Sequence, residues 1–103
     1  MAGHDFKPLY EQYPKIIAEM PEVFTSHQFI LELAYQNQVE YIEALYNYRH
    51  DLRGDRPAPF MFVHGVLAQR LNSYPQLITQ IRKNAPSKHI FGYEETCSEW
   101  QKV

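Results

Sequence analysis

Hydrophobic side chains in the first half of the chain recur at intervals of three and four residues. This spacing brings side chains to one face of an α-helix. Polar residues at 36–38 interrupt the pattern, which leaves open whether it forms one long helix or two helices in succession. The positions expected to face the core of this region are Ile30, Leu33, Ala34, Tyr41, Ile42, Leu45 and Tyr48.

The start of this helical region is marked by the segment Phe-Thr-Ser-His-Gln-Phe at residues 24–29. As an N-cap, Thr25 can accept a hydrogen bond from the backbone N–H of Gln28, while the Gln28 side chain accepts one from the N–H of Thr25. Phe24 and Phe29 are spaced to close a hydrophobic staple over this capping box. These features together predict that a helix begins just after Thr25.

Prolines divide much of the remaining chain into shorter elements. Pro14 suits the first turn of a short helix over about 14–20, which Pro21 ends. The glycine- and proline-containing segment 51–58 is predicted to be an exposed loop. Pro59 is expected to open another helix, with an apolar stripe formed by Val63, Val66, Leu67 and Leu71.

A further helix is predicted from Ser73, which can cap it with Gln76 at the third position. In this helix Leu77, Ile78 and Ile81 would face inward.

The C-terminal tail leaves alternatives open, because residues 88–93 fit a short strand or a turn, and residues 94–102 fit a helix or a return strand. We expect its apolar residues Ile90, Phe91, Cys97 and Trp100 to anchor it to the core. The expected fold is mainly α, a compact bundle of four to five short helices in one domain over residues 1–103. It includes a helix-turn-helix-like pair, and a short C-terminal β-wing is the open alternative for the tail.

Composition narrows the class of protein. The 103 residues are 45% hydrophobic and include eight tyrosines, which is enough apolar surface for one folded core. Cys97 is the sole cysteine, so an intramolecular disulfide is excluded and a reducing compartment is favoured. No apolar run is long enough to span a bilayer, and the N-terminus does not resemble a signal peptide. We therefore expect a cytoplasmic protein without a membrane partner.

Charge is unevenly distributed along the chain, although the net charge is only −2. Residues 1–48 contain two lysines against seven acidic residues, whereas residues 49–89 contain seven Lys and Arg against two aspartates. The last fourteen residues contain one lysine and three glutamates. The basic segment fits an anion-binding surface, but the same pattern also arises when two halves neutralise each other in a fold.

Residues 64–83 resemble the helix-turn-helix pattern of DNA-binding regulators. In that pattern a small residue allows two helices to cross closely, a turn residue follows, and apolar residues seat the second helix on the first. Ala68, Asn72, Ile78 and Ile81 occupy these places, with Leu67 and Leu71 as core partners. The sequence departs from the pattern at Ser73, where an apolar residue is usual, and at Pro75, which shortens the second helix.

The resemblance implies that a helix from about Pro75 to Lys83 reads the major groove of double-stranded DNA through polar side chains. The segment 87–93 could then form a wing that brings Lys88 and His89 to the DNA backbone. The residues expected to contact DNA are Arg70, Gln76, Thr79, Gln80, Arg82, Lys83 and Lys88. The competing interpretations are a pair of packed helices that never touches DNA, and a tail that covers the core.

The chain does not carry the residue patterns of a self-contained enzyme. Cys97 lies among core-like residues, no two histidines have the spacing of metal ligands, and the glycines stand alone rather than in a phosphate-binding loop. We therefore expect no catalytic residue, no cofactor and no metal. The main hypothesis is a small DNA-binding regulator, which could be a homodimer. The alternative is a protein-interaction module or small inhibitor that docks through its tyrosines and acidic N-terminal half.

Overall fold

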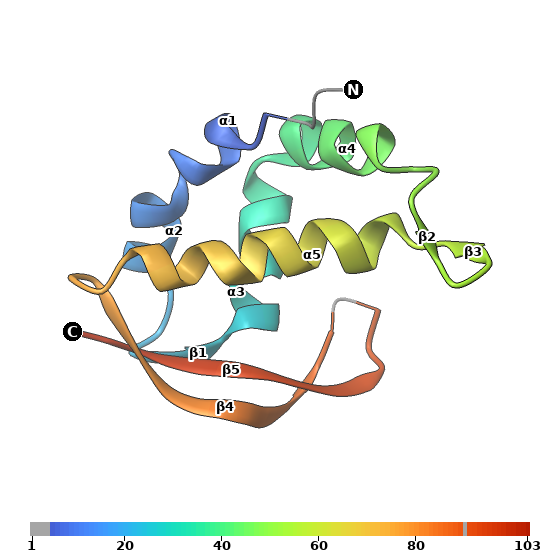
Figure 1. The fold of residues 1–103 in the computed structure, drawn as a ribbon. Coiled ribbons are helices and arrows are strands. Elements are labelled where there is room, and N and C mark those ends of the chain that lie inside the picture. Colours follow the sequence, from blue (N-terminus) through green and yellow to red (C-terminus); the bar gives the residue numbers. More distant parts are fainter. Residues whose placement is uncertain (1–4, 90) are drawn as a thin grey trace.

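A computed structural model describes residues 5–89 and 91–103, in which helices pack over a small antiparallel sheet (Figure 1). The helices are α1 (Lys7–Tyr10), α2 (Tyr13–Glu19), α3 (Ser26–Gln36), α4 (Gln38–Asn47), α5 (Pro59–Arg70) and the short 3-10 helix η1 (Leu71–Ser73). The strands are β1 (Val23–Thr25), β2 (Leu52–Arg53), β3 (Arg56–Pro57), β4 (Ile78–Lys88) and β5 (Glu94–Lys102). The fold is mixed α/β, so the expectation of a mainly α bundle is wrong.

The main sheet has the strand order β1-β5-β4, with every pairing antiparallel. In the β4–β5 hairpin the pairing runs from Ile78 opposite Lys102 to Lys88 opposite Glu94, and in β1 Phe24 lies opposite Trp100. The last strand in sequence therefore lies in the middle of the sheet. Residues 94–102 form the return strand, which decides between the two alternatives that the sequence left open.

The capping box predicted at Thr25 is present. The backbone N–H of Gln28 donates to Thr25 Oγ1 at 3.2 Å, and the Thr25 N–H donates to Gln28 Oε1 at 2.8 Å. The rings of Phe24 and Phe29 lie 6.2 Å apart, centre to centre, as the staple requires. The helical region that follows is two helices, because Asn37 has a non-helical backbone (φ −133°, ψ 55°) between α3 and α4.

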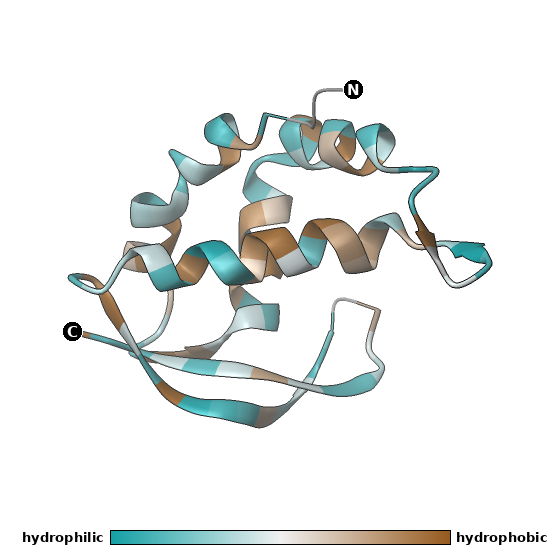
Figure 2. Ribbon diagram, viewed as in Figure 1, coloured by the Kyte–Doolittle hydropathy of each residue, from teal (hydrophilic) through white to brown (hydrophobic). Residues whose placement is uncertain are grey.

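The core lies between the helices and the inner face of the sheet. Tyr13 of α2 is completely buried, and its hydroxyl donates a 2.6 Å hydrogen bond to the carbonyl of Leu67 in α5. Trp100 closes the core from the sheet side and is 4% exposed. Apolar residues run along α5 and the part of α3 that it crosses, while the exposed hairpin is largely hydrophilic (Figure 2).

Residues 75–83 do not form the predicted helix. The chain turns after η1, with the Ile78 N–H donating to the Tyr74 carbonyl at 3.0 Å, and then enters β4. Ile78 is buried as expected, but Leu77 and Ile81 are 38% and 42% exposed. The β-branched residues of this segment suit a strand, and pairing with β5 satisfies more backbone groups than the single turn offered by a Ser73 cap.

Two further expectations about burial are corrected. Ile42, placed on the core side of the helical pattern, is 60% exposed on α4. Phe91, expected to anchor the tail, is 54% exposed, whereas Trp100 is buried as predicted. Cys97 is half-buried on β5, and Ile90 lies outside the described residues.

Candidate functional site

A groove of about 570 Å³ lies between α5 and the β4–β5 hairpin, and the N-terminal part of α3 also lines it. Its apolar walls come from all three elements. They are Ile30 of α3, Phe60 and Met61 of α5, and Phe91 and Trp100 of the hairpin. Such a concave surface, with a few polar groups among apolar ones, is typical of binding sites.

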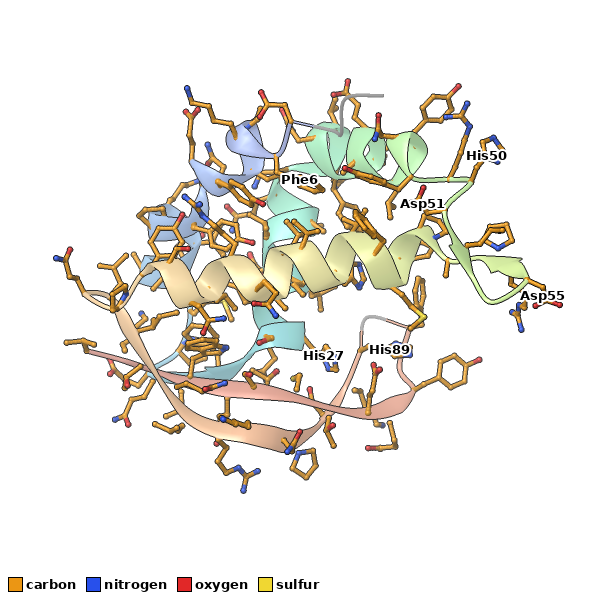
Figure 3. All side chains as sticks on the ribbon, viewed as in Figure 1. Phe6, His27, His50, Asp51, Asp55 and His89 are labelled. Atoms are coloured by element: carbon orange, nitrogen blue, oxygen red, sulfur yellow. The ribbon has the colours of Figure 1, made fainter. Side chains whose placement is uncertain are left out.

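Three imidazole rings line this groove, on His27, His64 and His89. The rings of His27 and His89 lie 6.3 Å apart in an edge-to-face arrangement, near one another between α3 and the tip of the hairpin (Figure 3). His27 Nε2 also lies 3.7 Å from a carboxylate oxygen of Glu95 on β5. Burial lowers the pKa of His27, and the Glu95 carboxylate opposes this shift.

His64 joins α5 to α4, because its Nε2 and the hydroxyl of Tyr41 share a hydrogen bond of 2.5 Å. Burial lowers the pKa of His64 to about 4, with smaller contributions in the same direction from His27 and His89. Burial also raises the pKa of Tyr41 to about 12. Both side chains are therefore neutral near pH 7, which suits a buried polar contact.

The tip of the hairpin rests on the N-terminal half of α5. The rings of Phe91 and Phe60 meet edge to face at 4.6 Å between centres, and the rings of His89 and Phe91 lie 5.6 Å apart. The turn itself uses Gly92 at φ +86°, whose N–H donates to the carbonyl of His89 at 2.8 Å. Helix α5 and the hairpin tip thus present one continuous surface.

Gly65 lies in the middle of α5 and is exposed. A Cβ atom built at this position would have no described atom within 4 Å, so packing inside the molecule does not require a glycine. Glycine inside a helix costs about 0.5–1 kcal/mol relative to alanine. Gly65 borders both the groove and a second hollow of about 520 Å³ on the other side of α5, lined in part by Tyr10, Phe62 and Arg70. The backbone of α5 is therefore open to close approach from outside.

Charged side chains are grouped by element of the fold rather than by half of the chain. From Arg56 to Tyr93 there is no Asp or Glu, and the five cations of this stretch lie on β3, α5 and β4. They are Arg56, Arg70, Arg82, Lys83 and Lys88. Residues 16–48, which include α3 and α4, contain five glutamates and neither Lys nor Arg.

The residues predicted to contact DNA do not share a helix. Gln76 lies exposed in the turn before β4, and the β4 residues follow it along a strand whose side chains point alternately to opposite faces. Those β4 residues are Thr79, Gln80, Arg82, Lys83 and Lys88, all exposed. Arg70 lies apart from them at the end of α5, with its guanidinium 4.3 Å over the ring of Tyr10.

Several of these side chains already have partners within the fold. Arg70 Nε donates to the Tyr74 hydroxyl at 3.3 Å, and Gln80 Nε2 donates to Ser98 Oγ at 2.6 Å. Arg82 Nε lies 3.4 Å from a carboxylate oxygen of Glu99. Lys83 is the one cation of the predicted set that lines the groove.

The sequence did not reveal the groove, whose lining residues come from segments far apart in the chain. The apolar pair Phe60-Met61 and the isolated Gly65 were the local signals that could have indicated an exposed contact surface on α5. Cys97 lines the groove on β5 but has no described basic partner for thiolate chemistry. Among the described residues, His, Cys, Asp and Glu side chains nowhere gather in threes to hold a metal ion.

Within the described part of the chain, every helix is too short or too polar to cross a membrane. Comparison of the chain with family models, with curated proteins and with solved structures gives no match. Function must therefore be argued from the geometry and charge of this surface.

Proposed function

We propose that this chain is a small DNA-binding domain of the winged-helix type, which contacts double-stranded DNA through α5 and the β4–β5 hairpin. The order of elements supports this proposal. A helix, α2, leads to β1, the helices α3 and α5 follow, and an antiparallel hairpin ends the chain with its last strand between the other two. This is the element order of a winged helix, with α4 and the β2–β3 hairpin inserted before α5.

In this arrangement the helix that enters the major groove is α5, one element earlier than the sequence suggested. An α-helix fits the width of the major groove. On α5 and η1 the polar side chains of Gln69 and Asn72 border the groove and are exposed. Asn72 Nδ2 donates to the Gln69 carbonyl at 3.1 Å, so the Gln69 side chain and the Asn72 side-chain oxygen are the groups offered to base edges. Gly65 between them and the N-terminus of α5 would let the DNA come close to the helix backbone.

The observation that carries the proposal is the contact of α5 with the hairpin tip, which forms one surface. Residues 56–93, which supply α5 and the tip, contain no carboxylate, and Glu95 of β5, which lies 3.7 Å from His27, lines the groove beside them. Phosphate contacts supply much of the affinity for DNA and are made by Lys and Arg. Lys83 borders the groove, and Lys88 is exposed at the end of β4, just before the tip that contacts α5. Both lysines lie on β4, where they are placed to contact successive phosphates of a strand lying along the groove.

The test is a fluorescence anisotropy titration of a labelled mixed-sequence duplex at several salt concentrations. The double variant Lys83→Glu/Lys88→Glu should bind at least about tenfold more weakly, and the slope of log affinity against log salt should fall by roughly 2. The matched control, Lys7→Glu/Lys15→Glu on α1 and α2, makes the same change in charge away from the surface. Equal weakening by both pairs, or absence of binding by the unmodified chain at low salt, would refute the proposal.

A further inference from the structure

A second surface, formed by α3 and α4, exposes large hydrophobic side chains. Two are tyrosines, Tyr35 at 69% exposure and Tyr46 at 64%. The others are Leu31, Val39 and Ile42, each more than half exposed. Helix α4 lies at the end of the molecule opposite the sheet (Figure 1), so this α3–α4 surface is separate from the groove and the hairpin.

The arrangement of these residues is regular. Within each helix they are spaced by three or four residues, Leu31 and Tyr35 on α3 and Val39, Ile42 and Tyr46 on α4. This spacing returns side chains to the same side of a helix. Val39, Ile42 and Tyr46 therefore form a row along α4, on the side away from the buried Tyr41 and Ala44. Leu31 and Tyr35 form the corresponding row on α3, away from its buried residues.

The charge around these rows is mainly acidic, with one cation at each helix: Lys15 Nζ donates to Gln36 Oε1 of α3 at 3.2 Å, and Arg49 lies at α4. Glu32, Glu40 and Glu43 belong to α3 and α4, and the nearest Lys or Arg along the chain are Lys15 before them and Arg49 after them. Arg49 lies with its guanidinium 3.8 Å over the ring of Tyr46, at the C-terminal end of the row. The surface is thus a set of apolar anchors with a mainly acidic surround, in which three glutamates outnumber the two adjoining cations.

We propose that the α3–α4 surface docks an amphipathic helix of a partner protein whose apolar face is flanked by Lys and Arg. Helical ligands present anchors at i, i+3, i+4 and i+7, which match rows of this spacing, and exposed tyrosine is favoured at protein interfaces. The acidic surround selects a basic partner by charge complementarity. A symmetric contact between two copies would instead bring the glutamates of both copies together, and nucleic acid would be repelled. This inference does not depend on the DNA proposal.

The probe for this inference is a pair of synthetic amphipathic helical peptides with the same leucine pattern, one with lysine and one with glutamate on the polar positions. Titration into the full ¹⁵N-labelled chain should shift amide resonances of α3 and α4 with the lysine peptide and not with the glutamate peptide. The variant Ile42→Ser/Tyr46→Ser should weaken this binding at least about tenfold, as expected when interface anchors are removed. Met61→Ser, which removes an equally exposed apolar side chain from α5, should leave it unchanged.

A charge-reversed variant distinguishes specific docking from non-specific hydrophobic binding. Glu40→Lys/Glu43→Lys should transfer the preference from the lysine peptide to the glutamate peptide. Shifts that map outside α3 and α4, or binding unaffected by Ile42→Ser/Tyr46→Ser, would overturn the proposal. Concentration-dependent dimerisation in light scattering, abolished by the same double variant, would assign the surface to a second copy and overturn it as well. Since the uncharged variant Ile42→Ser/Tyr46→Ser should leave DNA affinity the same, failure here leaves the DNA proposal standing.

Discussion

The indole N–H of Trp100 donates a 2.9 Å hydrogen bond to the hydroxyl of Ser26, which joins the central strand to the first turn of α3. The Ser26 hydroxyl also lies 3.4 Å from the carbonyl of Ser98, to which it donates. Trp100 and Ser26 are both buried, at 4% and 2% exposure respectively. This pair of contacts fixes one end of α3 on β5, and it therefore positions the part of α3 that lines the groove.

Trp100→Phe should lower the free energy of unfolding by about 1–3 kcal/mol, because the Ser26 hydroxyl loses its buried donor and part of the core volume is removed. Urea denaturation followed by circular dichroism measures the change. Ser26→Ala should also destabilise by leaving the indole N–H unpaired. The double variant should cost less than the sum of the two single variants, and strict additivity would show that the hydrogen bond contributes little.

Thr25→Ala should destabilise the chain by about 1 kcal/mol, since the N–H of Gln28 loses its acceptor at the start of α3. The conservative variant Thr25→Ser keeps the hydroxyl and should retain most of the stability. Thermal melts of the two variants provide the comparison. If both variants lost the same stability, packing of the Thr25 methyl group rather than capping would be responsible.

Stability should depend on pH through His64. Its pKa is about 4 in the fold and 6.5 as the ordinary value, so the unfolded chain binds the proton more readily and stability falls as the pH drops below about 6.5. The loss between pH 7 and pH 4.5 should be about 2 kcal/mol from this group. His27 is shifted in the same direction and adds to it.

The control for this dependence is His64→Gln, which keeps a polar side chain beside Tyr41 but does not titrate. Urea denaturation at several pH values should give a shallower decline for the variant than for the unmodified chain. Parallel pH profiles would mean that His64 is not the group responsible.

Gly65→Ala should have opposite effects on stability and on binding. Nothing described lies within 4 Å of the added Cβ, so the gain in helix propensity should stabilise the fold by about 0.5–1 kcal/mol. The same methyl group would hold DNA away from the backbone of α5 and should weaken binding several-fold. Melting temperature and anisotropy titration measure the two effects. A stabilised variant with unchanged DNA affinity would show that DNA binding does not need a glycine at position 65.

Local signals predicted the helical half of the fold correctly. The capping box at Thr25, the proline at position 14 and the proline at position 59 mark helices that are present as α3, α2 and α5. Each signal acts within one turn of helix, so the residues that satisfy it are neighbours in sequence. The break at Asn37 was left open because polar residues are tolerated on an exposed helix face as well as in a turn.

The segment after Ser73 shows where local reasoning failed. A serine followed by Gln76 resembles a capping box, and Ile78 and Ile81 have helical spacing. Both isoleucines are β-branched, and the strand that contains them, β4, pairs with β5 from Ile78 to Lys88. The partner strand lies some twenty residues away, and its influence is not visible in a short window of sequence.

The sequence by itself determined where α2, α3 and α5 begin, that the chain has a single thiol, and that its acidic and basic residues are separated along the chain. Only the tertiary structure decided that β5 inserts between β1 and β4, that residues 78–88 become a strand rather than part of a helix, and that the helix beside the groove is α5. The physical reason is the range of the interactions. Caps and helix periods depend on residues within a few positions, whereas strand pairing, the burial of Trp100 and the contact of Phe60 with Phe91 depend on segments that meet only after folding.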